Sequence, residues 1–139
     1  MKFFLILSKR TLAVIMAAVI IIFVLVAWAV SAKAAKIDGS TNEARMVYLK
    51  SLKLAAEDKN LTAKDIFIPQ DFSPVYENYN ELQKKSGFDL SDYKGKPATV
   101  YTYGLSGTDK QIHLIVCDGK IIGGDIADVK LGGKMQPLK

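Results

Sequence analysis

The chain has 139 residues but only one cysteine and one histidine, Cys117 and His113. A single cysteine cannot form an intramolecular disulfide, which excludes a disulfide-stabilised scaffold. A structural zinc site needs about four nitrogen or sulfur ligands, so one residue of each type is too few. We therefore expect no zinc site, and no other motif in the sequence indicates a cofactor.

Cys117 and His113 are also poorly placed to form a catalytic pair. A cysteine nucleophile needs its histidine at about 3 Å. Four residues apart on an expected strand, at about 3.3 Å per residue, their Cα atoms would lie about 13 Å apart. We expect Cys117 to be a half-buried residue beside a turn and His113 to be a polar residue on the sheet surface.

Other signatures of enzymes and metal sites are missing too. No phosphate-binding glycine loop and no dinucleotide fingerprint occurs. Asp118, Asp125 and Asp128 lack the spacing of an EF-hand calcium loop, and Asp118 is explained by a turn. Carboxylates such as Asp89, Asp92 and Asp125 could serve a small hydrolase, although they form no recognisable motif. Such a hydrolase remains the alternative to a non-catalytic binding function.

Positive charge is concentrated at the N-terminus. The formal net charge is +5, and residues 1–10 hold three cations and no acid. Residues 33–139 hold 16 cations and 14 acids, a net charge of +2. The basic character therefore reflects membrane topology more than a nucleic-acid-binding surface, and we expect no nucleic-acid partner.

Residues 11–32 contain no charge, no proline and no glycine. As a helix this segment is about 33 Å long, enough to cross a hydrocarbon core of about 30 Å. Trp28 lies near its end, where an indole suits the headgroup boundary. We predict a transmembrane helix in contact with the lipid bilayer. Signal peptides usually have shorter apolar regions, but Ala32-Lys33-Ala34 has the form of a cleavage site, so a secreted form stays open.

The cations before the apolar segment predict its orientation. Short basic termini tend to stay in the cytoplasm, whereas long domains are translocated largely regardless of charge. We expect residues 1–10 in the cytoplasm and residues 33–39 as a tether that spans at most about 25 Å. Residues 40–139 would then form one extracytoplasmic domain at the cell membrane.

Two helices and a short strand are predicted in the first half of this domain. Ser40 and Glu43 have the spacing of a capping box, and apolar residues at helical spacing predict a helix over residues 41–57. Residues 66–68 predict a short strand. Ser73 is a suitable N-cap for a second helix from Pro74 to about residue 85, and Gly87 fits its C-terminal cap.

Three strands are predicted next, over residues 98–103, 110–117 and 120–126. Asp118-Gly119 is a strong hairpin signal that sets Cys117 opposite Lys120. Gly123-Gly124 indicates a bulge or the close approach of a neighbouring element, and the tail from Asp128 predicts mostly loop.

The order of these elements predicts an α+β fold. One N-terminal transmembrane helix precedes a small domain, in which two helices pack on one face of a mainly antiparallel sheet of about four strands. The tyrosines of this domain suggest core packing, or else an aromatic groove between helix and sheet for a peptide or glycan. The candidate ligand or partner surface consists of Tyr76, Tyr79, Asn80, Gln83, Tyr101 and Tyr103.

Several short segments between Asn42 and Gly133 carry a family resemblance. They are Asn42-Glu43-Ala44-Arg45, Ile68-Pro69 with Phe72, Val75 to Lys84, Gly87-Phe88-Asp89-Leu90, Tyr93 to Lys96, Tyr101-Thr102-Tyr103 and Asp118 to Asp125. In this order they resemble the bacterial domain-of-unknown-function family 4830, which is found mainly in Firmicutes. The resemblance implies an N-terminal membrane segment followed by this one domain, and it supplies no reaction mechanism.

The chain departs from the family pattern in two places. The family has a longer loop after the Tyr101-Thr102-Tyr103 strand and a cysteine soon after the segment that corresponds to Gly123-Gly124-Asp125. Here the loop is short and Ala127 and Asp128 follow, so no role of that cysteine carries over to Cys117. We expect a single-pass membrane-anchored envelope protein with a binding or interaction module for an envelope protein, peptide or glycan.

Overall fold

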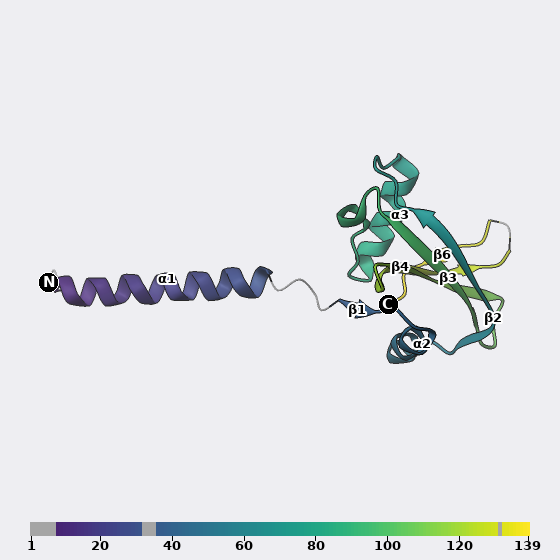
Figure 1. Ribbon diagram of the computed structural model, residues 1–139, viewed down its shortest axis with the longest axis horizontal. Helices are drawn as coiled ribbons and strands as arrows, with labels where there is room; N and C mark the ends of the chain where they lie inside the picture. The colour runs from purple at the N-terminus through teal and green to yellow at the C-terminus, as the bar shows by residue number, and fades with distance from the viewer. Residues whose placement is uncertain (1–7, 32–35, 131) are drawn as a thin grey trace, which may run out of the picture. The chain divides into compact units, whose positions relative to one another are not determined.

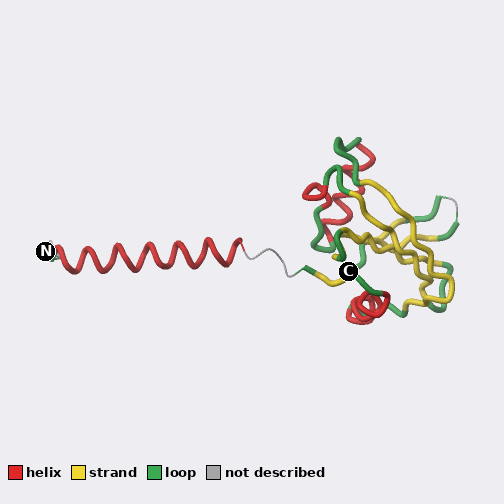
Figure 2. The backbone as a smooth tube through the Cα atoms, in the orientation of Figure 1, coloured by secondary structure: helices red, strands yellow, loops and turns green. Residues whose placement is uncertain are grey.

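The computed structural model describes residues 8–31, 36–130 and 132–139 (Figures 1 and 2). The chain divides into an N-terminal unit, which contains helix α1, and a folded unit that begins at Lys36. The Trp28 side chain and the segment Ala32-Lys33-Ala34, to which the sequence analysis assigns roles, lie outside the described residues.

Helix α1 spans Lys9–Ser31, which is 23 residues. Its segment Lys9–Val26 has a mean hydropathy of 2.4, and none of that segment is buried against other parts of the chain. At 1.5 Å per residue the helix is about 35 Å long. It is therefore long and apolar enough to cross a membrane, as the sequence predicts.

The folded unit contains a six-stranded sheet in the order β1-β5-β4-β3-β2, with β6 also paired to β5. All five strand pairs are antiparallel. The strands are β1 Ile37–Asp38, β2 Ala56–Phe67, β3 Pro97–Leu105, β4 Lys110–Cys117, β5 Lys120–Asp128 and β6 Met135–Gln136. The α+β class with an antiparallel sheet is confirmed, and the sheet has six strands where about four were expected.

Helices α2 (Asn42–Ser51) and α3 (Pro74–Lys85) pack on opposite faces of this sheet. On one face Leu49 of α2 packs with Tyr103, Ile112, Leu114 and Val116. On the other face Tyr76 and Tyr79 of α3 pack with Ala98, Ile115, Cys117 and Ile122. The expectation of two helices on one face is corrected, because β4 is buried on both faces and each face needs a cover.

Helix α2 ends at Ser51, six residues before the predicted end. Lys53 adopts a positive φ of 60°, and the Leu54 amide donates to the Leu49 carbonyl, which is the hydrogen bond of a Schellman cap. The chain then runs as β2 through a segment that was expected to be helix and loop, except at its end, where the strand predicted over residues 66–68 overlaps it. Most of β2 is exposed, and five of its 12 residues are charged, as suits an edge strand.

The cap of α2 is one residue away from the predicted position. The Thr41 side chain, not that of Ser40, accepts from the Ala44 amide at 3.1 Å. Ser40 instead donates its hydroxyl to Asp38 at 2.7 Å. For α3 the predicted cap is confirmed, because Ser73 accepts from the Tyr76 amide.

We expect Thr41→Ala to lower the free energy of unfolding by about 1 kcal/mol, since it removes the acceptor of a first-turn amide. Ser40→Ala is the matched control, with an expected loss below about 0.5 kcal/mol because its hydrogen bond is exposed. Urea unfolding of both variants measures the difference. A larger loss for Ser40→Ala would contradict the observed cap.

The β4–β5 hairpin forms as predicted. Asp118 and Gly119 have φ values of 49° and 72°, and Cys117 pairs with Lys120. A register shift follows in which Ile122 has no partner on β4, so the strand bulges directly before Gly123-Gly124. Gly124 also lies so close to β4 and to Leu138 that no side chain fits there.

Both ends of the folded unit contain more structure than expected. Ile37 and Asp38, which the sequence analysis assigns to a tether, form β1 and pair with β5. At the other end β6 also pairs with β5, and Leu138 is buried in the core beside α2. Such two-residue strands are defined by their pairing partner, so they leave no periodic pattern in the sequence.

Candidate ligand-binding cleft

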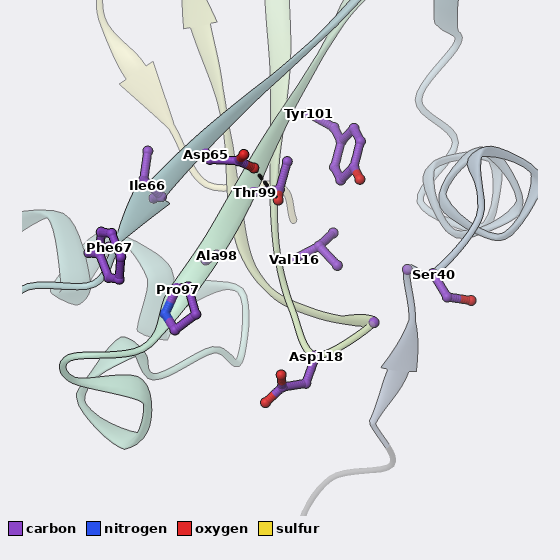
Figure 3. A pocket seen from close by; sticks show the side chains of 12 residues that line it. Ser40, Asp65, Ile66, Phe67, Pro97, Ala98, Thr99, Tyr101, Val116 and Asp118 are labelled. Carbon is purple, nitrogen blue, oxygen red and sulfur yellow. Dashed lines mark hydrogen bonds between the residues drawn. The ribbon is translucent and has the colours of Figure 1, made fainter.

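An open cleft of about 640 Å³ lies on the face of the sheet that α2 covers in part (Figure 3). Asp65 and Phe67 of β2, Thr99 and Tyr101 of β3, and Val116 of β4 contribute side chains to it. These residues share a face because side chains alternate along each strand and the three strands are in register. The β4–β5 turn and the link from β1 to α2 complete the lining.

The cleft is apolar along its floor and acidic at its ends. Val116 forms part of the floor and is 8% exposed, whereas Phe67 is 74% exposed. Asp65 accepts a hydrogen bond from the Thr99 hydroxyl at 2.9 Å, which fixes its carboxylate over β3 (Figure 3). Asp118 lies in the hairpin turn at the other end. The arrangement suits an elongated ligand with an apolar part and a polar group.

Arg45 holds the wall of the cleft in place. Its guanidinium lies 3.6 Å from the centre of the Tyr101 ring, and its Nε donates to the Tyr103 hydroxyl at 2.8 Å. Its Nη1 donates to the Gly39 carbonyl at 2.8 Å. Arg45 is only 5% exposed, and no carboxylate in the described part of the chain forms an ion pair with it. The cation is therefore held by neutral oxygens and an aromatic ring.

A second polar cluster lies on the opposite face, under α3. Asp125 is 2% exposed, and its carboxylate accepts from the Tyr79 hydroxyl at 2.7 Å. The Nδ1 atom of His113 lies 2.8 Å from the other carboxylate oxygen, and it is the donor because a carboxylate only accepts. Burial, together with the nearby Asp125 charge, raises the pKa of Tyr79 far above its ordinary value. None of the three residues lines the cleft.

This raised pKa predicts a loss of stability at alkaline pH. The folded domain keeps the Tyr79 proton when the unfolded chain releases it near pH 10, so the stabilisation is present below that pH and lost above it. Burial raises the pKa values of Tyr48, Tyr76 and Tyr103 as well.

We expect Tyr79→Phe to reduce the fall of unfolding free energy above pH 10 by up to about 1.4 kcal/mol per pH unit. Urea unfolding at a series of alkaline pH values measures this slope. Loss of the hydrogen bond to Asp125 lowers the free energy of unfolding at every pH. Loss of the titrating hydroxyl changes only the slope of that free energy against pH. An unchanged slope in the variant would contradict this explanation.

The sheet separates the six residues of the predicted ligand surface into two groups. Tyr76, Tyr79, Asn80 and Gln83 lie on the α3 side, and Tyr101 and Tyr103 lie on the α2 side. Of the six, only Tyr101 lines the cleft, and Tyr103 is fully buried. The structure therefore forms no single groove that contains all six.

The side chains of Asn80 and Gln83 form hydrogen bonds within the domain. Asn80 donates to Asp89 at 3.0 Å and accepts from the Leu90 amide at 2.7 Å. Gln83 accepts from the Gly124 amide at 2.7 Å, which ties α3 to β5. The amide groups expected at a ligand surface thus stabilise the connection of α3 to the sheet.

The carboxylates considered for a hydrolase do not meet in the cleft. Asp89 caps the short helix η1 (Leu90–Tyr93), and hydrogen bonds from Asn80 and Ser91 lower the pKa of Asp89. Asp125 lies on the other face with His113, and Asp92 belongs to η1. The carboxylates that do line the cleft are those of Asp65 and Asp118.

Tyr101 was predicted from the sequence, whereas Asp65, Phe67 and Arg45 were not. Ile66 and Ile68 face the core, and on a strand this alternation places Phe67 outward. An aromatic residue at an outward position of the strand, two residues before Pro69, was a signal that could have been used. Arg45 offered no such signal, since basic residues on helices are usually exposed.

A comparison with protein families provides one match. A family model described as Domain of unknown function (DUF4830) matches residues 53–126, more than half of the chain. The chain belongs to this family. The searches of curated proteins and of solved structures return no match. The DUF4830 match runs from the end of α2 into β5, so it contains the Asp65, Phe67, Tyr101 and Asp118 positions of the cleft.

Proposed function

We propose that this DUF4830 protein is a single-pass membrane-anchored module whose extracytoplasmic domain binds a ligand in the cleft. The observation that carries the proposal is the open cleft of about 640 Å³ with Phe67 exposed beside it. Small-ligand sites have volumes of about 300–1,000 Å³ and combine apolar walls with a few polar groups. The exposed Phe67 ring beside the cleft offers apolar surface that a bound ligand would remove from water.

The proposed membrane attachment rests on α1. The helix is long enough to span the bilayer, and Lys9 and Arg10 at its start favour a cytoplasmic N-terminus. The alternative is a secreted domain, released by cleavage after the apolar segment. The intact mass of the mature protein separates the two forms, because only the anchored form retains residue 1.

Exposure of the two cleft carboxylates favours binding over hydrolysis. A general acid in a glycosidase is usually desolvated by apolar neighbours, which raises its pKa towards neutrality. Asp65 and Asp118 are both exposed to solvent. The cleft provides apolar contact and negative charge without the buried carboxyl group that acid catalysis needs.

Site-specific photo-crosslinking in intact cells tests the proposed binding function. A photoreactive amino acid replaces Phe67 in the full-length chain, and the control replaces Val129, which is 59% exposed and outside the cleft. We expect a discrete adduct with an envelope protein, peptide or glycan from position 67 only. No adduct, or identical adducts from both positions, would overturn the proposal.

A further inference from the structure

We propose that the C-terminal segment, residues 134–139, is a releasable strap over an apolar site at Gly124, and that the free site accepts the same segment from a second copy of the chain. The inference goes beyond ligand binding in the cleft, because neither Gly124 nor the strap lines it. The strap also lies outside the family match, which ends at residue 126. It is therefore an addition to the part of the domain that DUF4830 describes.

Long hydrogen bonds connect the strap to the rest of the domain. The Asp128 amide donates to the Lys134 carbonyl and the Lys134 amide donates to Asp128 Oδ2, both at 3.3 Å. The Lys139 amide donates to the Ser86 hydroxyl oxygen at 3.4 Å. Bonds between these atom types are usually about 2.9–3.0 Å long. Strand β6 has only two residues, and Pro137, which lacks an amide proton, follows it.

One side chain of the strap nevertheless fits the domain closely. Leu138 is 4% exposed, whereas the side chains of Met135 and Gln136 face solvent. Leu138 fits because position 124 is a glycine. A Cβ there would lie 2.6 Å from the Leu138 side chain and 3.1 Å from that of Leu114. The Gly124 site therefore has the shape of this leucine, although few other contacts hold the strap.

The remaining strands stay paired when the strap is removed from the sheet. Strand β5 pairs with β4 from Lys120 to Asp128, and β1 pairs with the first two residues of β5. Release of the strap breaks only the β5–β6 pairing and exposes one buried side chain. Such a local opening needs much less free energy than unfolding of the whole domain.

A second copy is the partner that fits the free site, because the structure shows which sequence fills it. Leu138 fills the site of its own chain, and an open strap meets an identical site on a neighbouring copy. Gly132, with a φ of 76°, and Gly133 precede the strap and can change backbone conformation without a steric penalty. Attachment of the copies to one membrane, as proposed above, would raise their local concentration.

Thiol labelling of the full-length protein in detergent micelles tests release of the strap. Leu138→Cys introduces a thiol that becomes accessible when the strap opens. Leu49→Cys is the matched control, because Leu49 belongs to the same core cluster and the substitution removes the same apolar volume. We expect Leu138→Cys to be labelled at least about 100-fold faster than Leu49→Cys without denaturant, because local opening is more frequent than global unfolding.

The urea dependence of the two labelling rates provides a second readout. Local opening exposes little surface, so the rate for Leu138→Cys should change little at low urea concentrations, whereas the rate for Leu49→Cys should rise steeply. Equal rates with the same urea dependence would show that Leu138 is exposed only when the domain unfolds. That result would overturn both parts of the proposal.

Cysteine crosslinking between two differently tagged full-length copies tests the exchange. One copy carries Met135→Cys and the other carries Ala127→Cys, the residue opposite Met135 in the β5–β6 pair. In the control the second copy instead carries Val47→Cys, which is 68% exposed on α2. A disulfide needs Cα atoms about 4.4–6.8 Å apart, so mild oxidation should give at least about fivefold more mixed dimer with Ala127→Cys than with the control.

The results separate this inference from the proposed function. Fast labelling of Leu138→Cys without a mixed dimer above the control would overturn exchange between copies while confirming the strap. Neither experiment involves the cleft, so a position-67 crosslink would support ligand binding whatever the strap does. Loss of that crosslink would in turn leave the labelling and dimer results unchanged.

Discussion

Replacing Gly124 with alanine should lower the free energy of unfolding by about 2–3 kcal/mol, the largest loss that we expect from one methyl group in this domain. A Cβ at this position would lie 2.5 Å from the His113 carbonyl oxygen and 2.6 Å from the Leu138 side chain. The first contact is with the backbone of the paired strand β4, which cannot move without breaking the sheet. The Gln83 contact to the Gly124 amide would also be disturbed.

Gly104→Ala is a matched control for Gly124→Ala. Gly104 lies in β3, and the nearest atom to an added Cβ there is 3.8 Å away. We expect the free energy of unfolding to stay the same or to rise by about a few tenths of a kcal/mol, because alanine restricts the unfolded chain. Urea unfolding followed by near-ultraviolet circular dichroism measures both variants. Similar losses in the two would contradict the close approach at Gly124.

Replacing Arg45 with alanine should cost about 3 kcal/mol, even though the residue is a single cation on a short helix. The substitution removes charge-assisted hydrogen bonds to Tyr103 and to the Gly39 carbonyl, and it removes the guanidinium stacked on Tyr101. These contacts connect α2, β3 and the segment after β1. We therefore expect both Tyr103 in the core and Tyr101 at the cleft to lose a contact that holds them in place.

Arg45→Lys is the more informative variant. Lysine keeps the positive charge but cannot present a planar group to Tyr101 while also donating to both oxygens. We expect it to lose about 2 kcal/mol in urea unfolding, whereas Lys50→Ala on the exposed side of α2 should lose less than about 0.5 kcal/mol. A fully stable Arg45→Lys protein would show that charge alone matters at this position.

The helix ends show what the sequence could predict and what it could not. Both α2 and α3 end in the same cap, with hydrogen bonds from Leu54 to Leu49 and from Phe88 to Gln83. In α3 the residue with positive φ is Gly87, the expected type, and the helix was predicted correctly. In α2 it is Lys53, which disfavours that conformation, so the end of the helix could not be seen from residue type.

Of strand β2 only the C-terminal end was predicted, as the short strand over residues 66–68, and the rest was missed for a related physical reason. Its partly buried positions are Ala56, Leu61 and Ile66, five residues apart. That spacing fits neither the period of 2.0 for a strand nor 3.6 for a helix. A register irregularity between Glu57 and Thr62 lets Ala56 and Leu61 pack on the same face of the sheet, whereas ordinary alternation places Ile66 on the opposite face. Irregular edge strands of this kind are defined by pairing, not by sequence pattern.

The residues of the cleft could not be grouped from the sequence either, because the pairing of β2 with β3 was not predicted. Tyr101 was identified from its residue type and from the alternation of β3. Asp65 and Phe67 join it because β2 pairs with β3, and Asp118 joins it because the hairpin turn lies beside β1. A correct assignment of β2 and of the two sheet faces would have been needed to bring these residues together.

The central claim is that a membrane-anchored domain presents its cleft outside the cell membrane. The most direct test is labelling of full-length Phe67→Cys in intact cells with a membrane-impermeant maleimide. The native Cys117 provides little background, because it is buried and burial raises the pKa of its thiol. We predict labelling of a membrane-bound protein that retains residue 1, with no labelling of the native chain. Labelling only after cell lysis, or only of a shortened protein in the medium, would contradict the account.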